Sequence, residues 1–414
     1  MTLLQKPQDI ALLRGGQAYF PALIAAIDEA ITSIQLETYI FDMYGVGADV
    51  ADALARAAQR GLTVQVLVDG IGSDELSADW KQKLRDAGVQ WCVFSPLAAG
   101  FGSLGLLAPS RWRRLHRKLC VIDQRLVFCG GINILDDYYD PNHGVLQSPR
   151  FDFALKATGP LALEAAHATA LLWWRTRAGA SARKRQLGLA LDNLKVSGYG
   201  RRTSSEVVQP DGMPAATSVV AMPGAKAALV LRDNLRNRNS IEKSYLRAIG
   251  QAREDIVIAN AYFLPGGKLR RALVAAARRG VRVTLLLQGK YEYFMQYHAV
   301  RPVYTVLLAA GVEIHEYEAS FLHAKVAVVD GHWATVGSSN LDPLSLLLAR
   351  EANVVVEDRA LASQLREHLQ TAITSQGRQI DAVAYSQRTL RQRMLGHVAY
   401  ALMRFGIWLV GKRY

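Results

Sequence analysis

Two short segments of the chain carry a histidine, a lysine and an aspartate at identical spacing. A single His-x-Lys-x4-Asp pattern would arise by chance in roughly one chain in a hundred at ordinary residue frequencies. Two copies in one chain therefore indicate a chemical purpose for these side chains. The copies are His116, Lys118 and Asp123 in the first half and His323, Lys325 and Asp330 in the second.

Each copy is followed at the same distance by Gly-x-x-Asn, which ends in Asn133 and in Asn340. A histidine and a lysine two positions apart on a strand project from the same face, and a hairpin-like return would bring the asparagine beside that strand. Two such units facing each other would supply two imidazoles, two ammonium groups and two amides. This set suits phosphodiester chemistry, in which one group attacks phosphorus, another protonates the leaving oxygen and others stabilise negative charge.

The elements that must position the motifs are themselves repeated. Tyr39 and Gly88 recur as Tyr262 and Gly311, each 223 residues later. Strands alternating with helices of this length predict a duplicated α/β fold with a buried, largely parallel sheet. The expected helices cover residues 18–33 and 240–252, and the expected strands cover 34–41, 61–69, 256–264 and 279–287.

Charge and composition narrow the range of partners. The net charge of +13 and the isoelectric point near 9.7 favour a polyanion, which could be nucleic acid or an anionic membrane surface. The three cysteines lack CxxC spacing, so neither a disulfide framework nor a zinc site is indicated, and a reducing cytoplasm is favoured. We expect no signal peptide and no membrane-spanning helix, so that any membrane contact would be peripheral.

The paired motif resembles the phospholipase D superfamily, whose signature is this pattern occurring twice in one chain. The resemblance implies two similar α/β/α sandwich domains that share one active site at their interface. It implies a two-step reaction that uses no metal and no other cofactor. His116 would attack phosphorus to form a phosphohistidine, and His323 would act as general acid and then as general base, with the reverse assignment also open. Lys118, Lys325, Asn133, Asn340 and Ser338 would contact the phosphate oxygens, unevenly between the halves because Gly131 stands where the second half has Ser338.

A nucleophilic imidazole needs its second nitrogen anchored, and superfamily members use an acidic residue about thirty positions downstream. Asp152 follows His116 by 36 residues and Glu351 follows His323 by 28, so these acids are the candidates that orient the histidines. The motif aspartates, Asp123 and Asp330, belong to the catalytic motif, although their place at a strand end favours a structural role.

Longer runs resemble bacterial cardiolipin synthases of the short form that lacks N-terminal membrane helices. The resemblance covers about residues 15–369, and its most specific runs are 231–234, 259–265 and 332–354. It implies that a phosphatidyl group passes from phosphatidylglycerol, or a related donor, to a second phosphatidylglycerol, giving cardiolipin and glycerol. A phospholipase D or a nuclease that hydrolyses phosphodiesters is the alternative, because the motif determines the reaction type and not the substrate.

Two segments outside the motifs favour a lipid. Residues 97–108 form an apolar, glycine-rich insert before an arginine cluster, which suits lipid tails and a headgroup phosphate but is also compatible with an ordinary variable loop. Residues 388–414 hold six Lys or Arg and no acid, with apolar residues on one helical face. They predict a helix lying on anionic lipid, or alternatively a helix packed back onto the protein. The apolar face comprises Leu390, Met394, Val398, Leu402, Phe405 and Leu409, and the arginine cluster comprises Arg111, Arg113, Arg114 and Arg117.

These features divide the chain into four parts. Phospholipase-D-like domains are expected over residues 1–177 and 217–375, a linker over 178–216 and a basic amphipathic tail over 376–414. The predicted partners are phospholipids (phosphatidylglycerol and cardiolipin) and an anionic membrane surface. Nucleic acid is disfavoured because the apolar insert and the tail would have no use there. We expect a peripheral protein on the cytoplasmic face of a bacterial membrane, and the sequence makes no prediction of oligomeric state.

Overall fold

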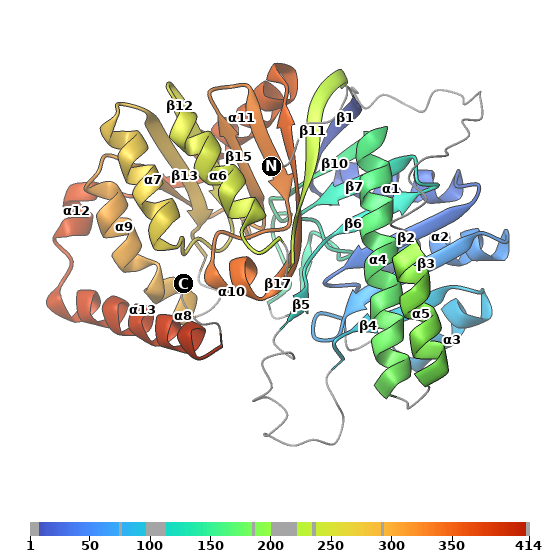
Figure 1. Cartoon of the computed structure of the whole chain (residues 1–414). Coiled ribbons are helices and arrows are strands. Elements are labelled where there is room, and N and C mark those ends of the chain that lie inside the picture. Colours follow the sequence, from blue (N-terminus) through green and yellow to red (C-terminus); the bar gives the residue numbers. More distant parts are fainter. Residues whose placement is uncertain are drawn as a thin grey trace.

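Two halves with matching strand order make up the structure, and their sheets join edge to edge (Figure 1). The computed structural model describes residues 8–73, 77–96, 113–141, 143–183, 187–199, 222–233, 237–290 and 294–410. The first half comprises β1 (Gln8–Arg14), α1 (Gly15–Asp28), β2 (Ser33–Thr38), α2 (Val46–Gln59), β3 (Thr63–Asp69), α3 (Ala78–Asp86), β4 (Gln90–Phe94), β5 (Arg114–Leu115), β6 (Leu119–Ile122), β7 (Leu126–Gly130), β8 (Tyr139–Asp140), β9 (Gly144–Val145), β10 (Phe153–Thr158), α4 (Pro160–Arg183) and α5 (Leu187–Tyr199). The second half comprises β11 (Met222–Arg232), α6 (Ser240–Gln251), β12 (Asp255–Asn260), α7 (Gly267–Arg278), β13 (Arg282–Gln288), α8 (Phe294–Ala299), α9 (Arg301–Leu308), β14 (Glu313–Tyr317), β15 (Lys325–Val329), β16 (Trp333–Gly337), α10 (Pro343–Leu347), β17 (Ala349–Glu357), α11 (Arg359–Gln376), β18 (Gly377–Gln379), α12 (Ala382–Ser386) and α13 (Leu390–Val410).

The strand order repeats outward from the centre of the sheet. It runs β1-β10-β7-β6-β2-β3-β4 in the first half and β11-β17-β16-β15-β12-β13-β14-β18 in the second, with β1 and β11 paired antiparallel between them. The repeat confirms the predicted duplication. Only β2, β3 and β4, and likewise β12, β13 and β14, are parallel neighbours along this path. The expectation of a largely parallel sheet is therefore wrong, because a short turn after each motif strand forces an antiparallel neighbour.

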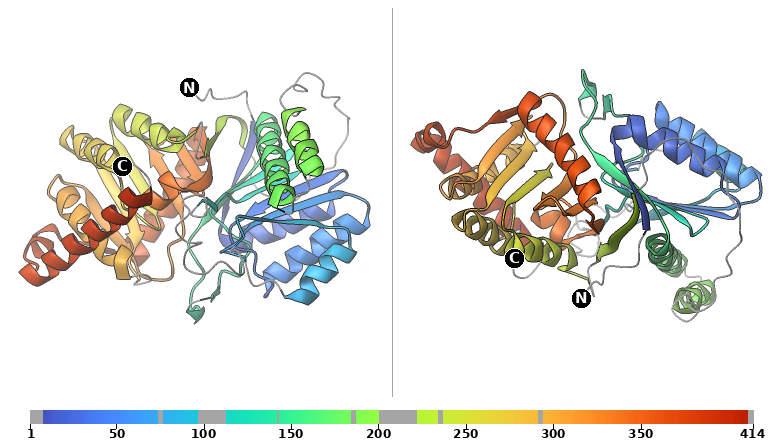
Figure 2. Two further views of the ribbon diagram at one scale, coloured as in Figure 1. Left: turned by 60° about the horizontal axis from the view of Figure 1, so that its bottom comes forward. Right: turned by 90° about the horizontal axis from the view of Figure 1, so that it is seen from above.

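Helices cover both faces of the sheet (Figure 2). On one face, α4 and α11 share an apolar core with strands from both halves; Leu161 and Leu365 belong to the same cluster as Leu155 and Val354. On the other face, α1 and α2 cover the first half, whereas α6, α7 and α9 cover the second, each with a core of its own. This arrangement confirms the α/β/α sandwich, and the shared core fixes the two halves relative to each other.

The turn after each motif strand explains why the motif ends in aspartate. Asp123 begins the turn between β6 and β7 with a φ of 51°, and Asp330 begins the turn between β15 and β16 with a φ of 49°. Aspartate adopts this left-handed region more readily than most residues because its short side chain can bond locally. The turn then returns the chain as β7 or β16, which is the hairpin that the sequence predicts.

The segment predicted as a linker is helical over its first part. The helix α4 continues to Arg183 and α5 covers Leu187–Tyr199, whereas residues 200–216 lie outside the described residues. The glycines and serines of this segment favoured the prediction of a linker, but its leucines and alanines are strong helix formers and extend the helices into it. The predicted tail likewise begins as β18, which pairs with β14 at the edge of the sheet.

The last helix, α13, has one covered face and one exposed face. It lies along α8 and α9, where Ala399, Tyr400 and Met403 contact the core of the second half. The opposite face is exposed and carries the predicted apolar residues Leu390, Met394, Val398, Leu402 and Phe405; the side chain of Leu409 lies outside the described residues. The tail thus packs back onto the protein through one face, whereas contact of its exposed face with lipid remains a prediction. Within the described ranges, we find no helix that is both long enough and apolar enough to cross a bilayer.

Candidate active site

The two motif histidines open into one cavity between the halves. His116 lies between β5 and β6, and His323 lies just before β15, so both precede a strand rather than lying within one. The backbone N–H of His116 donates to the carbonyl of Arg350 at 3.0 Å, and that of His323 donates to the carbonyl of Phe151 at 2.9 Å. Each histidine is thus anchored to the opposite half of the chain.

The cavity is open to solvent. Its volume is about 1290 Å³ including the open mouth, and Asn133 and Asp152 line it together with both histidines. The two imidazole side chains are 16% and 22% exposed, so each ring has one edge in the cavity and the rest covered. In the part of the chain that the structure describes, no group of three or more His, Cys, Asp or Glu side chains is placed to hold a metal ion.

Each imidazole is held by a carboxylate from the opposite half. Oε2 of Glu351 lies 3.0 Å from Nδ1 of His116, and Oδ2 of Asp152 lies 2.6 Å from Nδ1 of His323. Each acid therefore orients the histidine of the other half and not the one that it follows in the sequence. Asp152 lies just before β10, and Glu351 lies in β17. With Nδ1 engaged, Nε2 of each ring is left for chemistry in the cavity.

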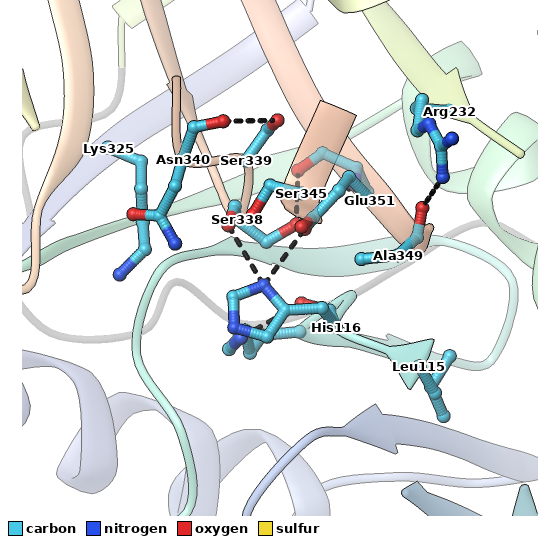
Figure 3. A network of polar contacts seen from close by, with 12 residues as sticks. Leu115, His116, Arg232, Lys325, Ser338, Ser339, Asn340, Ser345, Ala349 and Glu351 are labelled. Carbon is cyan, nitrogen blue, oxygen red and sulfur yellow. Dashed lines mark hydrogen bonds and ion pairs between the residues drawn. The ribbon is translucent and has the colours of Figure 1, made fainter. Parts of the chain in front are cut away.

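Ser338 is fully buried, and its hydroxyl supports Glu351 (Figure 3). Its hydroxyl donates to Oε2 of Glu351 at 2.6 Å and accepts from the backbone N–H of Ala352 at 3.0 Å, while its carbonyl lies 3.1 Å from Nδ1 of His116. The expected contact of this hydroxyl with a substrate phosphate is therefore corrected. In the first half Gly131 leaves no room for a side chain, because an added Cβ would lie 2.3 Å from Oδ1 of Asp152.

Both motif lysines are buried beside the histidines. Nζ of Lys118 donates to the carbonyl of His116 at 2.9 Å, and Nζ of Lys325 donates to the carbonyl of His323. Burial lowers the pKa of Lys118 to about 7, an effect that Glu351 opposes and the charge of Lys325 reinforces. Two positive groups thus lie next to the imidazoles, where negative charge on a phosphate would be stabilised.

The two motif asparagines are placed unequally. Asn133 lines the cavity, and its Oδ1 accepts from the backbone N–H of Ile40 at 3.2 Å. Asn340 is buried, and its Oδ1 has no hydrogen-bond partner among the described residues. In Figure 3 its side chain points to the same side as that of Lys325. Phosphate contacts by these amides remain a prediction.

The two carboxylates differ in their titration. Burial raises the pKa of Asp152 to about 7, although Lys325 opposes the rise. Burial also acts to raise the pKa of Glu351, but His116, Lys118 and the Ser338 hydroxyl outweigh it and hold the pKa below its ordinary value. Burial lowers the pKa of both histidines, and both lysines add to the effect. The pKa of His323 falls further, because Glu351 opposes the shift at His116. Glu351 is therefore ionised at neutral pH, whereas Asp152 titrates near neutrality.

Asp123 and Asp330 lie away from the cavity, and their inclusion among the catalytic residues is corrected. The carboxylate of Asp123 accepts from the backbone N–H groups of Ile31, Thr32 and Ser33 at 2.7–2.9 Å. The carboxylate of Asp330 does the same for Arg253, Glu254 and Asp255 at 2.9–3.0 Å. Each aspartate thus ties the end of a motif strand to the turn before its neighbour, β2 or β12, which is the structural role that the strand-end position favoured.

Sequence reasoning missed two matched pairs of residues around the site. The ring of Tyr39 lies 5.1 Å from that of His116, and Tyr262, its counterpart 223 residues later, lines the same cavity. Asp69 and Gln288 end the equivalent strands β3 and β13. Their side chains accept from the backbone N–H of the leucine before each histidine, at 2.7 and 3.2 Å. Both pairs could have been found from the sequence, because the two members of each pair occupy equivalent positions in the two halves.

Part of the arginine cluster serves the protein interior. Arg114 donates to the buried Asp69 at 3.1 Å, and Arg117 donates to the buried Glu37 at 2.7 Å. The predicted use of these two guanidinium groups for a headgroup phosphate is corrected, because buried carboxylates already engage them. Arg113 is exposed, whereas the apolar insert at 97–108 and Arg111 lie outside the described residues.

Comparisons with known proteins agree on one family. A family model described as "Cardiolipin synthase, PLD-like domain" matches residues 23–147 and 245–373. Cardiolipin synthase B of Escherichia coli (strain K12) is 37% identical over 97% of this chain and 89% of that protein. Cardiolipin synthase of Geobacillus sp. (strain WCH70) is 30% identical over 94% of this chain and 71% of that protein. The solved structure of phosphatidylserine synthase from Haemophilus influenzae Rd KW20 matches 97% of this chain and 96% of that one, with a TM-score of 0.65 and 17% identity, which is a likeness of fold. With its paired motifs meeting at one interface, the chain belongs to the cardiolipin synthase family of phospholipase-D-like proteins.

Proposed function

We propose that this chain is a phosphatidyltransferase that makes cardiolipin from two molecules of phosphatidylglycerol and releases glycerol. One observation carries the proposal: two motif histidines, each held through Nδ1 by a carboxylate of the opposite half, share one cavity. Such a pair can attack phosphorus and transfer a proton within one site. Membership of the cardiolipin synthase family supports a lipid as the substrate.

In the first step, Nε2 of His116 attacks the phosphorus of one phosphatidylglycerol. The bond from phosphorus to the glycerol headgroup oxygen breaks, and Nε2 of His323 gives its proton to that oxygen while Asp152 passes a proton to Nδ1. Glycerol leaves, and a phosphatidyl group remains bonded to His116. The ammonium groups of Lys118 and Lys325 stabilise the negative charge that develops on the non-bridging oxygens.

In the second step, a terminal hydroxyl of a second phosphatidylglycerol replaces glycerol. Nε2 of His323 takes the proton of that hydroxyl while Nδ1 returns a proton to Asp152, and the oxygen attacks phosphorus. The phosphorus–nitrogen bond breaks, which frees cardiolipin and restores His116. Both histidines return to their starting protonation states, so the cycle needs no further reactant.

The unequal carboxylates favour His116 as the nucleophile. An ionised Glu351 that accepts from Nδ1 raises the electron density of the His116 ring. Asp152, whose pKa is about 7, can share a proton with His323, as a proton donor and acceptor requires. A phosphatidyl ester with a nitrophenol headgroup tests the assignment, since nitrophenol leaves without an acid. H323Q should release one equivalent of nitrophenol in a burst and H116Q none, whereas the opposite result would reverse the roles.

The exposed apolar face of α13 supports docking on a lipid surface. Met394, Val398, Leu402 and Phe405 project from one side of the helix while the other side packs on the protein. Arg391, Arg393 and Arg404 add positive charge, which attracts anionic headgroups. Docking through this face would keep the protein peripheral on the cytoplasmic, anionic side of a bacterial membrane.

Lipid analysis of the full-length protein tests the function directly. Purified protein incubated with phosphatidylglycerol vesicles should form cardiolipin and glycerol in equal amounts. H116Q and H323Q should each lower the rate by about 10³-fold or more. H332Q is the matched control and should leave the rate unchanged, because this histidine is exposed at the β15–β16 turn. Phosphatidic acid as the main product would refute transfer in favour of hydrolysis, and full activity of H116Q and H323Q would refute the site.

A further inference from the structure

A second cavity adjoins the active site in the second half of the chain. It lies where β12 and β13 end, beneath α9 and α13, and its volume is about 680 Å³ including its open mouth. The wall is mainly apolar and includes Phe263, Leu264, Leu287, Val300, Tyr304 and Met403.

The two cavities share lining residues at the ends of the same strands. Tyr262, which follows β12, and Gln288, which ends β13, line both the histidine cavity and the apolar one. A molecule with a phosphate at the histidines and an apolar extension would therefore find apolar walls directly beyond these two side chains. The histidine cavity is the more polar of the two, with Asp137, Asp140 and Arg150 in its lining.

Three charged side chains line this cavity, and each has a partner within the protein. Lys290 donates to the carbonyl of Ala319 at 3.4 Å, and Asp342 accepts from the backbone N–H of Ser345 at 3.1 Å. Arg301 donates to Glu316 at 2.9 Å, and its guanidinium lies 4.0 Å from the centre of the Tyr297 ring. Because Glu316 pairs its charge and the Tyr297 ring covers its guanidinium, Arg301 does not need an anionic ligand. The cavity is thus suited to hydrocarbon rather than to a second phosphate.

The helix α13 links this cavity to the proposed lipid surface. Met403 contributes to the cavity wall, while its neighbour Leu402 belongs to the exposed apolar face. Figure 1 shows α13 running beside α8 along this edge of the second half. A hydrocarbon chain that leaves a membrane beneath α13 would need only to pass around this helix.

We infer that the apolar cavity holds one acyl chain of the glycerophospholipid whose phosphate lies between the histidines. The inference rests on the proposed function and adds to it a site that distinguishes diacyl lipids from their deacylated or short-chain analogues. The chain would lie along Phe263, Leu264 and Leu287, with its ester end near Tyr262 and Gln288.

A filled cavity tests the inference. Val300→Trp places an indole in the cavity. Val306→Trp is the matched control, because Val306 lies on α9, which Val300 directly precedes, and its side chain is exposed. Met403→Trp fills the same space from α13 and serves as the second variant. Cardiolipin formation is measured with phosphatidylglycerol carrying four-carbon or sixteen-carbon chains, both in the same detergent micelles.

The expected result is a change in chain-length preference. V300W and M403W should lower kcat/KM for the sixteen-carbon lipid by about tenfold or more, the loss expected when two or more methylene groups are expelled. Their kcat/KM for the four-carbon lipid should stay within about twofold of the parent protein, and V306W should match the parent on both. Equal losses on both lipids, or no loss on either, would overturn the acyl-chain site while leaving the proposed function intact. If the parent protein makes no cardiolipin from either lipid, the proposed function fails and the site fails with it.

Discussion

Replacing the motif aspartate of each half should weaken folding and leave chemistry largely intact. Asp123 accepts four hydrogen bonds: from the backbone N–H groups of Ile31, Thr32 and Ser33 and from the Thr32 hydroxyl, at 2.7–2.9 Å. Asp330 accepts three at 2.9–3.0 Å. Both residues also hold a positive φ that alanine adopts poorly.

The size of the effect follows from these contacts. The bonds are partly exposed, so water compensates for some of their loss, and Asp123→Ala should cost about 1–2 kcal/mol through them. The left-handed φ adds about 1 kcal/mol, for a total of roughly 2–3 kcal/mol. In a chain of 414 residues this corresponds to a fall in Tm of about 2–4 °C. Asp330→Ala should cost slightly less, and Asp123→Asn should cost least because asparagine keeps an acceptor and tolerates the same φ.

The dependence of Tm on pH in the acid range gives an independent check of the role of Asp123. Burial acts to raise the pKa of Asp123, but the hydrogen bonds from Ser33, Ile31 and Thr32 outweigh it and lower the pKa from its usual 3.8. The stabilisation is therefore present above about pH 4 and is lost as the pH falls further. The Tm difference between the parent protein and D123A should shrink below pH 4.

The assay compares thermal unfolding with turnover at 25 °C. D123A and D330A should keep kcat within about threefold of the parent, since neither carboxylate reaches the cavity. The reasoning would be refuted by a D123N variant that melts at the parental temperature yet loses more than about a hundredfold in kcat, because that result would require a direct role in chemistry.

Three further predictions concern the site and the surface. Because burial lowers the pKa of Lys118 to about 7, its positive charge is present below that pH and lost above it, so kcat/KM on soluble short-chain phosphatidylglycerol should fall as the pH rises through 7; a flat profile to pH 9 would contradict this. Leu402→Asp on α13 should weaken binding to anionic vesicles by about tenfold or more in a sedimentation assay, whereas Leu191→Asp on α5 should not, although the two leucines are 56% and 59% exposed; equal losses would argue against docking through α13. Gly131→Ser should push Asp152 away from His323 and lower kcat by about 10²-fold or more, while Ser338→Gly removes only a hydroxyl and should cost less; the reverse order would contradict the proposed role of Asp152.

The residues of the motifs and their local structure could be predicted from the sequence, because they form short patterns that occur in both halves. Each His-x-Lys pair, the hairpin after it and the following asparagine depend on residues within about twenty positions. The same holds for α13, whose apolar face follows from helical periodicity and is the exposed face in the structure.

The contacts that could not be predicted from the sequence join side chains that are far apart along the chain. Nothing in the local pattern of Ser338 distinguishes a hydroxyl aimed at substrate from one bonded to Glu351, because that choice is made by the pairing of β16 with β17. Arg114 and Arg117 looked available for a headgroup for the same reason. Their carboxylate partners, Asp69 and Glu37, come from strands 45 and 80 residues earlier.

Because the halves exchange carboxylates, the duplicated fold forms one active site that needs both halves. His116 takes its carboxylate from Glu351 and its backbone acceptor from Arg350, both in the second half. His323 takes the corresponding groups from Asp152 and Phe151 in the first. Neither half by itself holds a complete histidine–carboxylate unit, so duplication produces a single site with two complementary histidines rather than two independent sites. Small differences between the halves, such as Gly131 against Ser338, can then assign unlike roles to the two rings, because each difference acts on the histidine of the other half.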